Sequence, residues 1–245
     1  FYCDIKRPDG SIFESDTRAT LKRVVEECRS MDYACRMGTE CEFYLFKTDE
    51  NGAPTDHGFG YIDNAVKWCK AAELNIILDL HKTAGYSFDK GEGEFGFFDS
   101  EPLQERFMKL WDRIAERYAV SDGTIAFELL NEVTDQSFSE KWNRLIRSTI
   151  ERIRKIAPDT YILVGGYLNN SPDAVPDLDA PYDDKVIYNF HCYDPLKFTH
   201  QGAYWVDGMD TSFRMNIEDS EPAITPEYFI GRFNRAYEAA KANGT

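Results

Sequence analysis

The chain has 245 residues, of which 42% are hydrophobic and 14% aromatic, enough for one barrel-sized domain or two smaller ones. It has 28 basic and 43 acidic residues. The resulting net charge of −15 argues against nucleic acid and anionic membranes as partners, because both require a basic patch. No stretch reaches the roughly 18 apolar residues of a membrane helix. The six cysteines show no CxxC spacing, so we expect free thiols on buried elements rather than a zinc site or disulfides.

The first sixty residues mix strand, turn and helix patterns. We expect a short strand over 1–6, a turn at Pro8-Asp9-Gly10, a helix over 16–31, a strand over 33–46 and a polar turn over 47–60. This segment therefore predicts an architecture of its own.

From residue 61 onward, amphipathic helices alternate with short apolar strands. The predicted helices cover 62–73, 103–118, 139–156 and 226–242, and the predicted strands cover 75–81, 124–132, 161–165 and 185–193. Strands that alternate with helices of this length predict βα units and a parallel sheet covered on both faces. The Asp-rich stretch 173–184 is expected to be a solvated loop.

Polar side chains stand at the carboxyl ends of three of these strands. The run Phe127–Leu130 stops on Asn131 and Glu132, the strand 75–81 ends on His81, and the strand 185–193 ends on His191 and Tyr193. A single Asn-Glu pair is commonly just a turn, and a single His is more often structural than catalytic. Three successive strand ends together favour a functional rim, since parallel α/β barrels carry their chemistry there.

Glu132 is the candidate acid/base. Hydrolysis of a glycosidic bond needs a carboxyl group that can protonate the leaving oxygen, and sugar hydroxyls are bound by side chains such as Asn131, His81, His191 and Tyr193. The chain is also rich in aromatic residues, whose faces can stack on sugar rings, although most of these rings are expected in the core.

Three motifs give a family resemblance. Leu78-Asp79-Leu80-His81, Phe127-Glu128-Leu129-Leu130-Asn131-Glu132 and Phe190-His191-Cys192-Tyr193-Asp194-Pro195 resemble glycoside hydrolase family 5, which contains many β-1,4-glucanases (cellulases). The resemblance covers about residues 61–245. It implies a TIM-type (β/α)8-like parallel barrel and a hydrolase that cleaves β-glucan or cello-oligosaccharides, in endo or exo mode, by a retaining double displacement.

The same resemblance implies the site. Glu132 would be the acid/base, while His81, Asn131, His191, Tyr193 and Trp205 would bind the sugar, with no metal or organic cofactor. It favours a secreted protein.

The family also has a second glutamate, the nucleophile, on its seventh strand, and no such strand follows the helix 226–242. Glu42, Glu92 and Glu94 are candidate replacements, and Glu128 is a further candidate, expected four residues below Glu132 on the same strand face. A retaining pair of carboxyl groups lies ~5–5.5 Å apart and an inverting pair ~6.5–9.5 Å apart.

Residues 1–60 resemble another enzyme. The strand Gly38-Thr39-Glu40-Cys41-Glu42-Phe43 is similar to one in glutamine synthetase, where the glutamates bind metal; these would map to Glu40 and Glu42. Alternate carboxylates on one strand face also suit any half-solvated strand. Since the remaining ligands and the ATP site are absent, we expect no metal here, and the chain has the pattern of a fusion.

This leaves about six βα units, too few to close an eight-stranded barrel, so we expect an incomplete barrel or one completed by a homo-oligomer. Two alternatives to a hydrolase stay open: a catalytically impaired barrel that binds carbohydrate, and a protein related to glutamine synthetase.

Overall fold

The computed structural model describes residues 4–13, 16–32, 38, 56–88, 95–119 and 122–244. The chain forms two compact units, Phe1–Phe43 and Tyr44–Thr245. In the first unit the predicted helix is confirmed as α1 (Thr17–Ser30), and the buried Asp16 side chain caps it by accepting hydrogen bonds from two backbone N–H groups of its first turn.

The described part of the predicted strand 1–6 is not a strand. Lys6 instead makes an isolated antiparallel bridge with Ile12 around the turn at 8–10. The turn chemistry of Pro8-Asp9-Gly10 therefore folds this segment back on itself. The predicted strand 33–46 lies outside the described residues, apart from Gly38.

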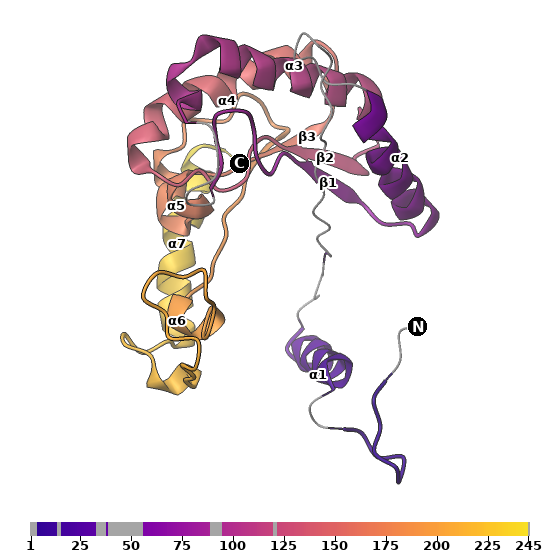
Figure 1. Ribbon diagram of the computed structural model, residues 1–245, viewed down its shortest axis with the longest axis vertical. Helices are drawn as coiled ribbons and strands as arrows, with labels where there is room; N and C mark the ends of the chain where they lie inside the picture. The colour runs from indigo at the N-terminus through magenta and orange to yellow at the C-terminus, as the bar shows by residue number, and fades with distance from the viewer. Residues whose placement is uncertain are drawn as a thin grey trace. The chain divides into compact units, whose positions relative to one another are not determined.

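The second unit alternates helices and strands as the sequence predicts (Figure 1). Its helices are α2 (Asp56–Ala71), α3 (Glu101–Tyr118), α4 (Ser139–Arg154), α5 (Tyr167–Asn170), α6 (Leu196–Thr199) and α7 (Pro226–Ala242). Its strands are β1 (Ile76–Asp79), β2 (Ile125–Glu128), β3 (Tyr161–Val164) and β4 (Val186–Tyr188), and short 3-10 helices cover Phe97–Asp99, Gln136–Phe138, Pro172–Asp177 and Ile217–Asp219. None of the described helices is long and apolar enough to cross a membrane.

The four strands form one parallel sheet in the order β1-β2-β3-β4. In its register, Asp79 of β1 pairs with Glu128 of β2, and Glu128 pairs with Leu163 of β3. Parallel strands in sequential order, joined by helices, are a portion of a (β/α)8 barrel. All carboxyl ends consequently meet at one edge of the sheet.

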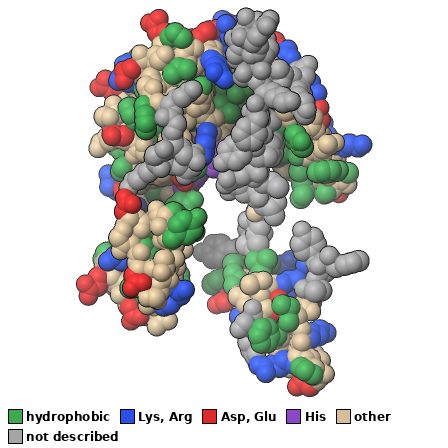
Figure 2. Space-filling view, in the orientation of Figure 1, with side chains coloured by type: hydrophobic (Ala, Val, Ile, Leu, Met, Phe, Trp, Pro, Cys, Tyr) green, Lys and Arg blue, Asp and Glu red, His purple; other side chains and the backbone are tan. Residues whose placement is uncertain are grey.

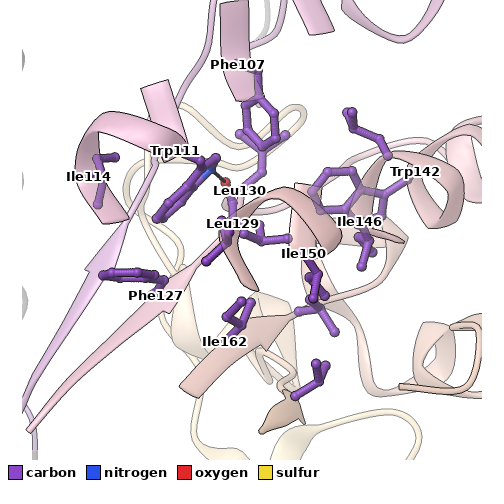
Figure 3. Packing of buried hydrophobic residues seen from close by; sticks show 14 of the residues in the cluster. Phe107, Trp111, Ile114, Phe127, Leu129, Leu130, Trp142, Ile146, Ile150 and Ile162 are labelled. Carbon is purple, nitrogen blue, oxygen red and sulfur yellow. Dashed lines mark hydrogen bonds between the residues drawn. The ribbon is translucent and has the colours of Figure 1, made fainter. Parts of the chain in front are cut away.

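The core lies between this sheet and the helices α3 and α4. Trp111 and Trp142 project from the two helices and are almost fully buried; the Trp111 ring lies 5.5 Å from that of Phe127 on β2, and the Trp142 ring 6.5 Å from that of Phe107 on α3 (Figure 3). Each indole N–H donates to a backbone carbonyl next to a strand end: Trp111 to Leu129 at 3.1 Å and Trp142 to Gly165 at 2.9 Å. The helices are thereby fastened at the edge that carries the polar residues.

The opposite face of the sheet departs from the prediction. Both faces were expected to be covered, but Ile77 of β1 is 53% exposed and Ile187 of β4 is 42% exposed. The inward side chains of a barrel are buried by the strands across from them, and the described sheet has four strands. Figure 2 shows a further group of hydrophobic side chains over α2, where Tyr61 and Trp68 are exposed.

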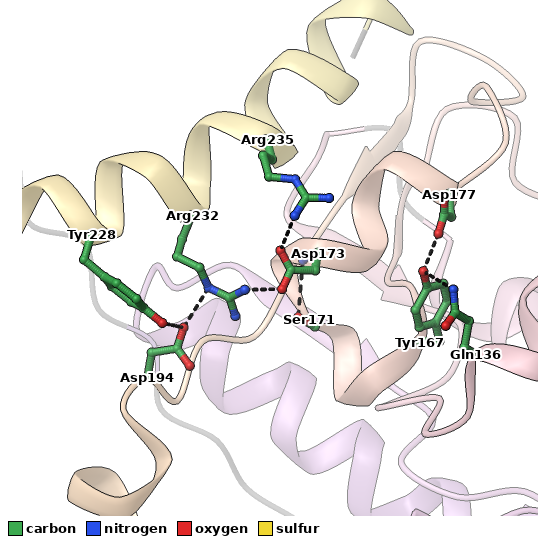
Figure 4. Close-up of polar contacts among 9 residues, drawn as sticks. All are labelled: Gln136, Tyr167, Ser171, Asp173, Asp177, Asp194, Tyr228, Arg232 and Arg235. Atoms are coloured by element: carbon green, nitrogen blue, oxygen red, sulfur yellow. Dashed lines mark hydrogen bonds and ion pairs between the residues drawn. The ribbon is translucent and has the colours of Figure 1, made fainter. Parts of the chain in front are cut away.

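The described cysteines Cys28, Cys69 and Cys192 are free thiols, as expected, but they are half-exposed rather than buried. The Asp-rich stretch 173–184 is a solvated loop only in its second half, where Asp179 and Asp184 are exposed, because Pro172–Asp177 forms a 3-10 helix. Asp173 pairs with Arg232 and Arg235 of α7, and Asp177 accepts a hydrogen bond from Tyr167 (Figure 4). Asp173 thereby joins the 3-10 helix to α7, and Asp177 joins it to α5.

Candidate active site

A sharp turn presents Glu132 at the carboxyl edge of the sheet. Strand β2 ends at Glu128, four residues earlier than the predicted end, and Glu132 has a left-handed backbone with φ of 46°. This conformation costs a non-glycine residue on the order of 1–3 kcal/mol and persists only where the surroundings hold it. Glu128 therefore does not share a strand face with Glu132, because the turn redirects the later side chain.

The hydroxyl group of Tyr86 holds the backbone of this turn. Its buried hydroxyl donates to the backbone carbonyl of Glu132 at 2.8 Å and accepts from the N–H of Thr134 at 2.9 Å. Burial raises the pKa of Tyr86, which keeps the hydroxyl protonated as a donor.

Three side chains converge on the carboxylate of Glu132, and the residue as a whole is 9% exposed. His191 Nδ1 lies 2.7 Å from Oε1, the Tyr193 hydroxyl donates to the same oxygen at 3.4 Å, and the Asn169 amide donates to Oε2 at 3.2 Å. The structure thus brings together Glu132, His191 and Tyr193, which sequence analysis had placed at one rim.

Burial and hydrogen bonding have opposite effects on the pKa values of Glu132 and His191. Burial raises the pKa of Glu132, but the hydrogen bonds from His191 and Asn169 and the nearby imidazoles lower it, and the net direction is down. The hydrogen bond to Glu132 raises the pKa of His191 against the opposing effect of burial. In this arrangement the carboxylate and the imidazolium stabilise each other.

His81 and Asn131 stand beside this group. The chain after β1 continues the ladder, with the Asn131 N–H donating to the Leu80 carbonyl at 3.2 Å. His81 Nδ1 lies 2.9 Å from an Asp79 carboxylate oxygen, and its charge contributes to lowering the pKa of Glu132. His81 therefore faces the same edge as Glu132, through a ring held by Asp79.

Glu128, at the end of β2, accepts a hydrogen bond from the Asn189 amide at 2.6 Å.

Trp205 lies on the chain after α6, is 66% exposed and meets the Tyr204 ring edge-on at 5.0 Å. The residues Glu40, Glu42, Glu92 and Glu94 lie outside the described residues. Within the described ranges, no group of three or more His, Cys, Asp or Glu side chains could hold a metal ion.

Asn169 and Tyr86 are the site residues that sequence reasoning missed. Asn169 belongs to a stretch without hydrophobic periodicity, and the Asn-Asn pair at 169–170 was its only signal, since asparagine tolerates the left-handed backbone. Tyr86 has the appearance of one more core aromatic residue.

A parallel βα sheet with a hydrogen-bonded carboxylate and paired imidazole at its carboxyl edge defines a barrel protein with a rim site suited to acid/base chemistry. Residues 34–245 match the model of the cellulase family, glycosyl hydrolase family 5. The chain belongs to glycoside hydrolase family 5.

Individual proteins similar to this chain support its place in the family. The chain is 50% identical over 202 residues to cellodextrinase A of Ruminococcus flavefaciens, covering 82% of this chain and 60% of that protein. Among solved structures it is similar to endoglucanase Cel5A from Thermotoga maritima, with a TM-score of 0.67 and 28% identity over 81% of this chain and 60% of that one. The chain thus spans about 60% of the length of these relatives.

The second resemblance is also confirmed, over a short stretch. The chain is 46% identical over 66 residues to glutamine synthetase of Clostridium saccharobutylicum, covering 26% of this chain and 15% of that enzyme.

Proposed function

We propose that this chain is a β-1,4-glucan-cleaving glycoside hydrolase in which Glu132 is the general acid/base. The observation that carries the proposal is the buried Glu132 carboxylate at the strand edge, held by His191, Tyr193 and Asn169. Membership of family 5 and the similarity to a cellodextrinase and an endoglucanase support a glucan or cello-oligosaccharide as substrate.

In this proposal Glu132 protonates the glycosidic oxygen and later deprotonates water. His81, Asn131, His191 and Tyr193 hydrogen-bond the sugar at the cleaved bond, and an exposed Trp205 offers an aromatic face for stacking.

The second carboxylate is a separate proposal, with Glu42, Glu92 and Glu94 as candidates. A carboxylate placed ~5–5.5 Å from Glu132 raises the Glu132 pKa by like-charge repulsion, which prepares it to act as an acid. This repulsion opposes the lowering of that pKa by His191 and Asn169.

The proposal is tested by the release of reducing sugar from carboxymethylcellulose and cello-oligosaccharides by the wild-type chain and by Glu132→Gln. We expect activity in the wild type and its loss in the variant, with the fold retained. A folded but inactive wild type would contradict it.

A second candidate is a site that binds glucan without cleaving it. It is favoured by the lowered pKa of Glu132, because an ionised carboxylate accepts hydrogen bonds from hydroxyls but cannot donate a proton. Titration calorimetry with cellotetraose separates the two, since this candidate predicts binding without product. A glutamine synthetase-related activity ranks last, because that likeness covers 26% of the chain.

We further propose that residues 1–60 are a glutamine-synthetase-like segment joined to a hydrolase portion over 61–245, and that the chain forms a homo-oligomer that completes the sheet. Exposed Ile77 and Ile187 on the described sheet support an additional covering surface. Light scattering after gel filtration tests the assembly: a dimer or larger species is expected, and a monomer would contradict it.

A further inference from the structure

The segment after β3 has an unusual backbone. Leu168, Asn169 and Asn170 have φ of 51°, 56° and 56°, so α5 contains three successive left-handed residues. Each such residue is unfavourable for an L-amino acid, and a run of three persists only where other contacts impose it. Several of its contacts lead to the Glu132 site.

Two backbone hydrogen bonds tie this segment to the turn that carries Glu132. The N–H of Leu168 donates to the carbonyl of Thr134 at 3.2 Å, and the N–H of Asn169 donates to the carbonyl of Val133 at 3.0 Å. The Asn169 side chain then reaches Glu132 Oε2 at 3.2 Å. The left-handed segment is thus fastened both to the backbone that follows Glu132 and to the Glu132 carboxyl group.

The end of the segment is fastened to the other partner of Glu132. Asn170 is fully buried, and its side chain packs so closely on Gly165 that a β-carbon there would lie 2.3 Å from Asn170 Cγ. The Asn170 carbonyl accepts from the N–H of His191 at 2.8 Å. One short segment therefore sets the positions of both Asn169 and the His191 backbone relative to Glu132.

We propose that Asn169 is a positioning residue for the acid/base: its amide fixes the Glu132 carboxyl group through Oε2, which leaves Oε1 facing His191 and Tyr193. This inference rests on the proposed function of Glu132. In this proposal the left-handed backbone of residues 168–170 places the Asn169 amide within hydrogen-bond distance of Glu132 Oε2.

Asparagine suits this position for two physical reasons. It is among the non-glycine residues that best tolerate the left-handed region. Its NH₂ group is also a neutral donor, so it holds the ionised carboxyl group in place without adding a positive charge to the site. Lys or Arg could stabilise only the ionised form, and would hold the acid in the state that cannot donate a proton.

The test compares Asn169→Gly with a matched control, Leu168→Gly. Glycine is permissive at both left-handed positions, so neither variant is strained, and the Leu168 side chain is 52% exposed. Glu132 is titrated by ¹³C NMR of glutamate-labelled protein, its signal assigned by the absence of that signal in Glu132→Gln. Tryptophan fluorescence of the buried indoles confirms folding.

We expect Asn169→Gly to raise the pKa of Glu132 by about one unit, because the lost hydrogen bond favours the ionised form. The kcat for cello-oligosaccharides should fall about tenfold with little change in KM, since misplacement affects the transition state. Leu168→Gly should leave both values at the wild-type level. Asn169→Asp should raise the pKa further, because it places a second carboxyl group against Oε2.

An unchanged Glu132 pKa in folded Asn169→Gly, or an equal shift in Leu168→Gly, would overturn the inference. The titration needs no turnover. If the wild type releases no sugar but Asn169→Gly shifts the pKa, the proposed function fails while the contact with Asn169 stands.

Discussion

The Glu132–His191 pair should contribute measurably to stability. His191 Nδ1 lies 2.7 Å from Glu132 Oε1, and the side chains are 27% and 12% exposed, respectively. Hydrogen bonds to charged groups contribute about 1.5–3 kcal/mol, and the partial exposure of the imidazole places this pair in the lower half of that range. A double-mutant cycle of Glu132→Gln and His191→Ala should therefore give a coupling energy of about 2 kcal/mol.

The coupling should depend on pH in a defined window. The pKa of Glu132 is lowered from 4.5, so its contribution is present above that value and is lost as the pH falls through the folded-state pKa. The pKa of His191 is raised from 6.5, so its contribution is present below that value and is lost as the pH rises through the folded-state pKa. The coupling should be greatest between pH 4.5 and 6.5.

Urea unfolding followed by tryptophan fluorescence measures this energy, since Trp111 and Trp142 are buried in the core of the second unit. The four proteins of the cycle are compared at pH 5.5 and pH 9. We expect about 2 kcal/mol at pH 5.5 and less than about 1 kcal/mol at pH 9, because raising the pH removes the imidazolium charge. A coupling near zero at pH 5.5, or one that does not change with pH, would refute the reasoning.

Two further predictions concern the surrounding framework. Trp142→Phe removes the hydrogen bond to the Gly165 carbonyl and should lower the free energy of unfolding by about 1–3 kcal/mol in urea; no change would show that water replaces the indole. Arg232→Ala removes the two ion pairs that this α7 residue makes with Asp194 and Asp173, and thermal unfolding should show a loss of about 2 kcal/mol. The exposed Arg235→Ala is its control and should cost less than about 1 kcal/mol; equal losses would contradict this account.

The organisation of the second unit could be predicted because its signals are local. The period of α7 and its Thr225 cap followed by proline give the same bounds in sequence and structure, Pro226–Ala242. Strand ends were predicted too late, at 132 and 193 rather than Glu128 and Tyr188, because apolar residues such as Leu129, Leu130 and Phe190 follow the last strand residue. Hydrophobicity cannot distinguish a strand from a buried turn.

The site was predictable where a residue stands at a strand end and hidden where the backbone is irregular. Glu132, His191 and Tyr193 meet because parallel strands bring their carboxyl ends to one edge. Asn169 depends on a left-handed run that its sequence signals weakly, and Glu132 itself has a backbone that glutamate does not favour. Such strain becomes visible only once the surrounding contacts are known.

The central claim is that Glu132 is a general acid/base, and the dependence of Glu132→Ala on the leaving group tests it most directly. A poor leaving group, as in cellotetraose, needs protonation, whereas the dinitrophenolate of an activated aryl cellobioside does not. We predict a loss of at least about a hundredfold in kcat/KM on cellotetraose and a much smaller loss on the aryl cellobioside. Equal losses on both substrates, or none on cellotetraose, would contradict the account.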